Sequence, residues 1–141
     1  DSQGAKLIAL GILEMLGETL PDAVGGMAIG ADPITAAVLT EAATQDKELR
    51  GFIVRKEAKV HGKGNQVEGP VQAGDRVVIV EDVVTTGGSS LKAIEYAEAA
   101  GLKVEGVIAI VDRLEGGREA FAAAGHELRT LFTVRDFGIE D

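Results

Sequence analysis

The sequence predicts a single-domain α/β fold, a doubly wound parallel sheet of about five strands with helices on both faces. Several runs, of which residues 77–80 (VVIV) are the clearest, are β-forming and apolar without polar alternation, as in strands buried on both faces. These runs alternate along the chain with segments of helical periodicity. Such alternation is typical of a parallel sheet covered by helices.

The expected elements follow one another in a regular order. Helices are expected over residues 4–18, 34–44, 91–100 and 115–124, and strands over residues 24–29, 51–56, 76–81, 104–111 and 127–132. Asp32 is expected to cap the second helix, with Pro33 in its first turn, and Gly101 to end the third. Residues 57–74 break the alternation and are expected to form a mobile loop, and residues 136–141 a polar tail.

Composition limits the classes of function. With 141 residues, 45% of them hydrophobic, the chain suits one domain over residues 1–141. It contains no apolar run long enough for a membrane span and no signal-peptide pattern, so a cytoplasmic protein is expected. The absence of cysteine excludes disulfides and thiolate metal sites, and any metal is expected to be Mg²⁺ brought by a phosphate ligand. The formal charge of −9 argues against nucleic-acid binding.

Residues 77–90 (VVIVEDVVTTGGSS) concentrate the chemistry. Two carboxylates, Glu81 and Asp82, are expected where the third strand ends, and the small residues 85–89 then precede a helix. Backbone N–H groups at a helix start, approached closely through glycines, suit a phosphate monoester. No lysine precedes the serine as in a nucleoside-triphosphate loop, and the dinucleotide glycine pattern is absent. The paired acids suit the vicinal hydroxyls of a ribose whose 5-phosphate lies in the loop.

This arrangement resembles the phosphoribosyl diphosphate (PRPP) signature of type I phosphoribosyltransferases and implies their fold. The resemblance covers four apolar residues, two acids, two apolar residues and a Thr/Gly/Ser loop. It implies that one continuous stretch binds PRPP. The residues are Glu81, Asp82, Val83, Val84, Thr85, Thr86, Gly87, Gly88 and Ser89.

A second string, RKEAKVHGKGNQVEG from Arg55, resembles the catalytic loop of orotate phosphoribosyltransferases. Four of the fourteen basic side chains and one of the two histidines lie within ten residues there. The resemblance implies that Arg55, Lys56, Lys59 and His61 contact the diphosphate of PRPP. It also implies a homodimer, with Lys59 and His61 reaching the neighbouring subunit's site. Lys59, His61 and Asp82 are the expected catalytic residues.

Two further segments gain roles from the same resemblance. Ala28, Ile29 and Gly30 follow the first strand and correspond to the loop that holds pyrophosphate, although Ile29 stands where orotate enzymes often have lysine. Arg113, in the segment Asp112-Arg113-Leu114-Glu115-Gly116-Gly117, corresponds to the arginine that binds orotate's carboxylate, a planar group that an arginine fork suits. Thr85 is the second expected orotate contact.

The implied reaction is Mg²⁺-dependent transfer of phosphoribosyl from PRPP to orotate in pyrimidine synthesis. Family members also carry an N-terminal segment that roofs the base site, and because the chain starts at Asp1 without methionine, that segment is expected to be missing. Two alternatives stay open. A purine-type phosphoribosyltransferase would keep the PRPP motif without needing the 55–61 string or Arg113. A non-catalytic regulator that senses PRPP would need a basic face for RNA or DNA.

Overall fold

A computed structural model describes residues 1–57 and 66–138. Its strands are β1 (Ala23–Met27), β2 (Arg50–Val54), β3 (Val67–Glu68), β4 (Arg76–Val84), β5 (Lys103–Asp112) and β6 (Leu128–Thr133). Its helices are α1 (Ser2–Leu16), α2 (Asp32–Thr44), α3 (Gly88–Ala99) and α4 (Gly117–Ala123), followed by a short 3₁₀ helix η1 (Val134–Phe137). The strands form one sheet in the order β3-β2-β1-β4-β5-β6. The predicted α/β class is confirmed.

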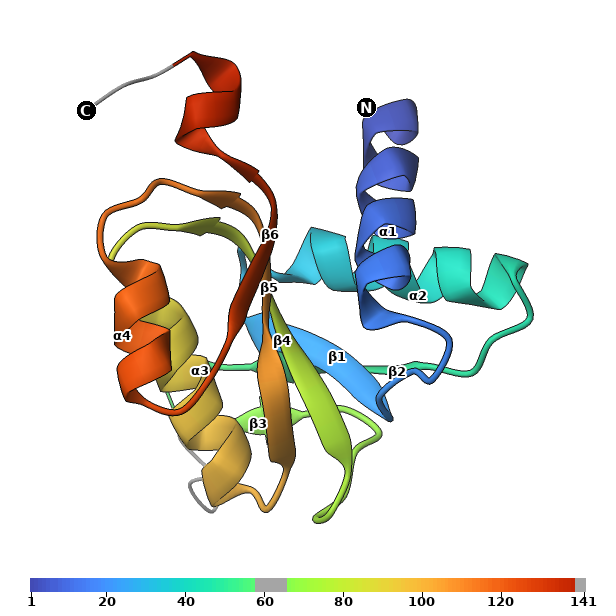
Figure 1. Ribbon diagram of the computed structural model, residues 1–141. Helices are drawn as coiled ribbons and strands as arrows, with labels where there is room; N and C mark the ends of the chain where they lie inside the picture. The colour runs from blue at the N-terminus through green and yellow to red at the C-terminus, as the bar shows by residue number, and fades with distance from the viewer. Residues whose placement is uncertain (58–65, 139–141) are drawn as a thin grey trace.

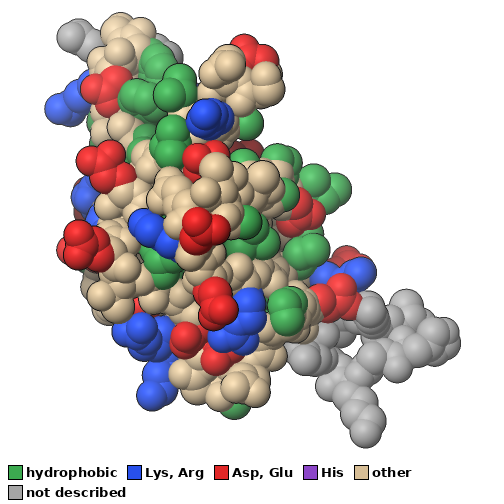
Figure 2. Space-filling model, turned by 90° about the vertical axis from the view of Figure 1, so that its right-hand side faces the viewer, with side chains coloured by type: hydrophobic (Ala, Val, Ile, Leu, Met, Phe, Trp, Pro, Cys, Tyr) green, Lys and Arg blue, Asp and Glu red, His purple; other side chains and the backbone are tan. Residues whose placement is uncertain are grey.

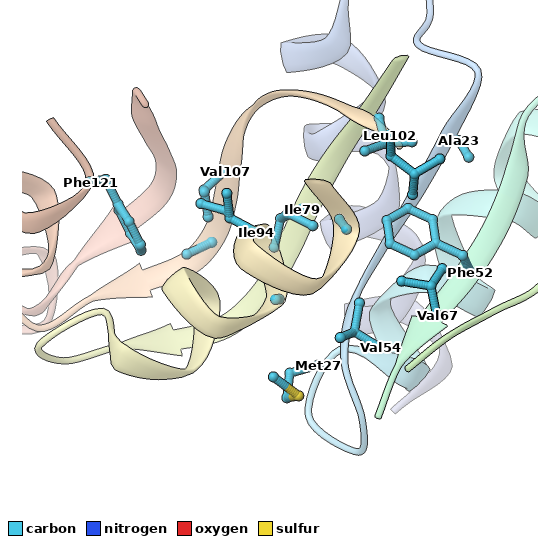
Figure 3. Packing of buried hydrophobic residues seen from close by; sticks show 14 of the residues in the cluster. Ala23, Met27, Phe52, Val54, Val67, Ile79, Ile94, Leu102, Val107 and Phe121 are labelled. Atoms are coloured by element: carbon cyan, nitrogen blue, oxygen red, sulfur yellow. The ribbon is translucent and has the colours of Figure 1, made fainter. Parts of the chain in front are cut away.

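Helices cover the sheet on both faces, with α1 and α2 on one side and α3 and α4 on the other (Figure 1). The apolar run in β4 is explained by this arrangement. Val78 belongs to the core beneath α1 and α2, whereas its neighbour Ile79 belongs to the core beneath α3. Phe52, Ile79, Ile94 and Phe121 lie in this second core (Figure 3). Alternate side chains of residues 77–80 thus fill two cores, and this run has no face left for polar residues.

The five predicted strands are all present, and the sheet gains one more at an edge. β3 is a sixth strand and runs antiparallel to β2, with Val54 opposite Val67 and Ile53 opposite Glu68. The other adjacent pairs are parallel, as predicted. β3 has two residues and lies in the stretch 57–74 that was expected to be a loop. A strand of two residues is too short to show the alternation of apolar and polar residues by which strands are predicted.

The predicted helix ends are partly confirmed. Pro33 lies in the first turn of α2, and Gly101 follows α3 in the left-handed region, at φ 88°. The prediction for Asp32 was wrong, because α2 begins at Asp32 itself and its cap is Ala31, which makes no side-chain cap hydrogen bond. Inside the first turn, the Asp32 carboxylate still interacts favourably with the helix dipole. The expected tail at 136–141 instead begins within η1.

A close approach between β1 and β4 at Gly26 predicts a stability effect. A Cβ added to Gly26 would lie 2.3 Å from the Val80 carbonyl oxygen and 2.8 Å from the Ala31 Cβ. We therefore expect Gly26→Ala to lower the free energy of unfolding by about 1–3 kcal/mol, measured by urea denaturation. Gly88→Ala is the control, since no atom lies within 4 Å of its added Cβ. Equal urea midpoints for the two variants would contradict this expectation.

On the face of the molecule seen in Figure 2, acidic and basic side chains are interspersed. In the described part of the chain, no helix has the length and apolar character needed to cross a membrane.

Candidate functional site

The acid pair lies within β4, not after it. Glu81 is paired with Ala109 of β5, and the ladder continues through Val83 and Val84 to the end of β4. The expectation that the strand ends at residue 81 was wrong because valines follow the two acids and keep the β-forming pattern going. The two side chains differ in exposure. Glu81 is buried, with 6% of its surface exposed, whereas Asp82 is exposed.

Glu81 lies beneath the first turn of α3. The Ser90 hydroxyl donates a hydrogen bond of 3.0 Å to its Oε2, and the backbone N–H of Asp82 donates one of 3.2 Å to its Oε1. Burial first, and then the neighbouring Asp82 carboxyl, together raise the pKa of Glu81 to about 7, with the Ser90 hydrogen bond opposing the rise. Glu81 therefore exchanges its proton near neutral pH in the free protein.

The raised pKa predicts how stability changes with pH. The unfolded chain releases the Glu81 proton near the ordinary value of 4.5, whereas the folded chain holds it to about 7. Glu81 therefore destabilises the fold progressively as pH rises through this window, and the effect is complete above it. We expect Glu81→Gln to gain stability relative to the original chain between pH 5 and pH 8, measured by urea denaturation. A difference between the two proteins that does not vary with pH would refute the raised pKa.

Residues 85–87 join β4 to α3, and Gly88 and Ser89 begin the helix; residues 85–89 together are called the phosphate loop after their predicted role. Thr85 and Thr86 are exposed, and Gly87 caps the helix at φ 92°, a left-handed conformation that favours glycine. A Cβ on Gly87 would also approach the Phe121 ring to 3.3 Å. The first N–H groups of α3 have no partner within the helix and lie at its positive end. Val84 is buried in the core, so within the predicted PRPP set it can offer only its backbone.

Residues 28–30 lie against the acid pair. A Cβ added to Gly30 would lie 3.2 Å from Asp82 Oδ1 and 3.4 Å from Glu81 Oε1. The Ala28–Ile29 peptide is cis, and the Ala28 N–H donates a 2.8 Å hydrogen bond to the Val54 carbonyl of β2. The Ile29 side chain is 80% exposed. The loop thus brings backbone groups, and no cation of its own, to the acids.

Of the four basic or histidine residues predicted after β2 to contact the diphosphate, the structure describes Arg55 and Lys56. Arg55 Nε forms an ion pair of 2.9 Å with Glu68 of β3. Lys56 lines a hollow of about 480 Å³ beside the phosphate loop, together with Met27, Gly88, Ser89, Lys92 and Tyr96. Lys59 and His61 lie outside the described residues. The sequence reasoning did not single out Lys92, whose only sequence signal is its place one helical turn after Ser89.

Arg113 follows β5, and its backbone N–H donates a 2.9 Å hydrogen bond to the Val84 carbonyl, directly before the phosphate loop. Its guanidinium is half-exposed and pairs with Glu115 at 2.9 Å. Arg113 and Thr85 are the two predicted orotate contacts. The backbone hydrogen bond therefore places the Arg113 segment beside the loop that begins with Thr85. The Glu115 pair is exposed and weak, and an anionic ligand can displace it.

The described residues contain no cluster of three His, Asp or Glu side chains suited to a metal ion. The acids at this edge fit a metal that arrives on a diphosphate, since Mg²⁺ is commonly held through substrate phosphates and water with few protein ligands.

Comparisons with known proteins identify the family of this chain. Residues 6–122 match the model of the phosphoribosyl transferase domain. The orotate phosphoribosyltransferase of Rhodopirellula baltica is 58% identical, over 98% of this chain and 75% of that protein. That of Aquifex aeolicus is 44% identical, over 96% and 74%.

Solved structures agree as well. The orotate phosphoribosyltransferase of Mycobacterium tuberculosis H37Rv in complex with PRPP aligns with a TM-score of 0.83 and 31% identity, over 99% of this chain and 78% of that chain. The resemblance drawn from the sequence motifs is confirmed. The chain belongs to the phosphoribosyl transferase family and, within it, to the orotate phosphoribosyltransferases.

Proposed function

We propose that this chain transfers the phosphoribosyl group of PRPP to orotate, releasing pyrophosphate and forming orotidine 5′-monophosphate in pyrimidine synthesis. The observation that carries the proposal is the meeting of three segments at the carboxyl edge of the parallel strands. Gly30 lies against Asp82, the phosphate loop follows β4, and the Arg113 N–H binds the Val84 carbonyl. Ligands of open α/β sheets bind at this edge. The PRPP complex of the Mycobacterium tuberculosis relative gives further support.

The proposed donor site uses three kinds of group. The amides of residues 85–89 bind the 5-phosphate, with the Thr85, Thr86 and Ser89 hydroxyls as further donors. Glu81 and Asp82 accept hydrogen bonds from the ribose hydroxyls. Because those hydroxyls favour an ionised acceptor, ribose binding near neutral pH draws the proton from Glu81. Residues 28–30 hold the diphosphate through their backbone.

The proposed chemistry is a displacement at carbon 1 of the ribose by a ring nitrogen of orotate. Positive charge develops on the ribose while negative charge develops on the leaving diphosphate. Arg55, Lys56, Lys59 and His61 surround that diphosphate and stabilise the transition state electrostatically. Arg113 and Thr85 hold the orotate in line with the reacting carbon. The protein supplies no covalent nucleophile.

Mg²⁺ is the proposed metal, and when bound to the diphosphate it neutralises part of the leaving group's charge. We further propose that residues 1–141 form one core domain. The chain acts as a cytoplasmic homodimer without a nucleic-acid or membrane partner, and Lys59 and His61 reach across the interface.

One assay tests the proposed activity. The chain is incubated with Mg²⁺, PRPP and either orotate or a purine base, and consumption of the base is followed. Consumption of orotate alone is the expected result. Consumption of the purine alone would indicate the purine-type enzyme, and PRPP binding without consumption of either base would indicate the regulator.

A further inference from the structure

Asp112 is a buried acid at the carboxyl end of β5 to which the proposed reaction assigns no role. Only 1% of its surface is exposed. It is the last residue of β5, in register with Val84 of β4 and Thr133 of β6. Burying a carboxyl group costs free energy unless its oxygens find partners, so its contacts indicate what it does.

One carboxyl oxygen holds the turn that follows the strand. Asp112 Oδ1 accepts a 2.8 Å hydrogen bond from the backbone N–H of Leu114. Leu114 has φ 60°, a left-handed conformation that is unusual for a leucine. An aspartate that binds the N–H two residues ahead stabilises such a turn. The residue enclosed between the two bonded positions is Arg113.

The second oxygen has only a distant partner. Among the described residues, Asp112 Oδ2 is buried without a hydrogen bond, and Arg118 Nε lies 3.8 Å away. Arg118 is itself held, because its Nη1 donates a 2.8 Å hydrogen bond to the Leu128 carbonyl at the start of β6. For stability alone, a small apolar residue would avoid the burial of this oxygen. We therefore explain the presence of an acid at position 112 by its bond to the turn, and not by a gain in the overall stability of the fold.

The same turn is joined to the phosphate loop at two points. The Arg113 N–H binds the Val84 carbonyl at 2.9 Å, and the Gly117 N–H binds the Thr85 carbonyl at 3.1 Å. Gly117 has no room for a side chain, since its added Cβ would lie 2.3 Å from Val84 Cγ1. The Gly117 end is thus also secured by packing, whereas at the Arg113 end the further support is the hydrogen bond from the Leu114 N–H to Asp112.

We propose that Asp112 is a positioning residue for the base, fixing the turn so that Arg113 is directed at the carboxylate of orotate. The inference rests on the proposed function, because it takes Arg113 as the orotate contact. Asp112 does not touch the substrate. Its effect is confined to ligands that carry the base, because the phosphate loop keeps its own contacts.

Two ligands separate the base site from the phosphate site. Orotidine 5′-monophosphate occupies both, whereas ribose 5-phosphate occupies only the ribose and phosphate part. Titration calorimetry on Asp112→Ala should show about a ten-fold loss of orotidine 5′-monophosphate affinity, with ribose 5-phosphate affinity within about two-fold of the original. Asp112→Asn keeps an oxygen acceptor for the Leu114 N–H and should restore most of the loss.

If Asp112→Ala does not fold, Leu114→Pro carries the test, since proline removes the donor N–H and cannot adopt positive φ. The same loss confined to orotidine 5′-monophosphate is expected. Equal losses for both ligands, or no loss for either, would overturn the positioning role. If the original chain binds orotidine 5′-monophosphate no more tightly than ribose 5-phosphate, the base makes no contact. That result would overturn the proposed function, and this inference with it.

Discussion

Asp82→Asn should weaken the binding of ribose 5-phosphate by about 10- to 100-fold, because a hydrogen bond to a charged group contributes about 1.5–3 kcal/mol. Asp82, the proposed ribose ligand, is the exposed member of the acid pair and lies against Gly30. Titration calorimetry measures the effect. Inorganic phosphate, which has no hydroxyl pair to offer, should bind the variant and the original chain alike.

Asp46→Asn provides the matched control for this substitution. Asp46 is exposed after the end of α2 and has φ 56°, which asparagine also tolerates. The change in net charge is the same in both variants. If Asp82→Asn binds ribose 5-phosphate as tightly as Asp46→Asn does, Asp82 is not a ribose ligand.

Lys59→Ala should lower turnover by about 100- to 1000-fold, the range typical for loss of one group that stabilises transition-state charge. The KM for PRPP should change far less, because the lysine acts on charge that develops as the diphosphate leaves. A steady-state assay with orotate separates the two parameters. Lys63→Ala, a charge-matched change four residues further along the sequence, is the control. Turnover equal to that of the original chain would remove Lys59 from the mechanism.

Most of the fold could be predicted because periodicity reports burial. The run 77–80 is apolar on both faces, and the structure places Val78 and Ile79 in different cores. Errors arose where local signals conflict with tertiary pairing. Glu81 and Asp82 suggest the end of a strand, yet pairing with β5 carries β4 through them to Val84. β3 consists of two residues held by β2, and no local pattern marks so short a strand.

The sequence predicts which residues belong to the candidate site, but it does not predict the contacts between them. The acids, the phosphate loop and Arg113 are visible as residues that follow apolar runs. Which backbone groups join them is visible only in the fold, as in the bond from the Arg113 N–H to the Val84 carbonyl. Asp112 shows the same limit, because an aspartate after a strand has no distinctive neighbours until Leu114 is seen in the left-handed region.

A crystal structure of this chain with PRPP and Mg²⁺ tests the central claim most directly. The account predicts the 5-phosphate within hydrogen-bonding distance of the amides of residues 85–89, the ribose hydroxyls on Glu81 and Asp82, and the diphosphate toward residues 28–30 and Lys56. PRPP bound with its 5-phosphate away from residues 85–89 would contradict it.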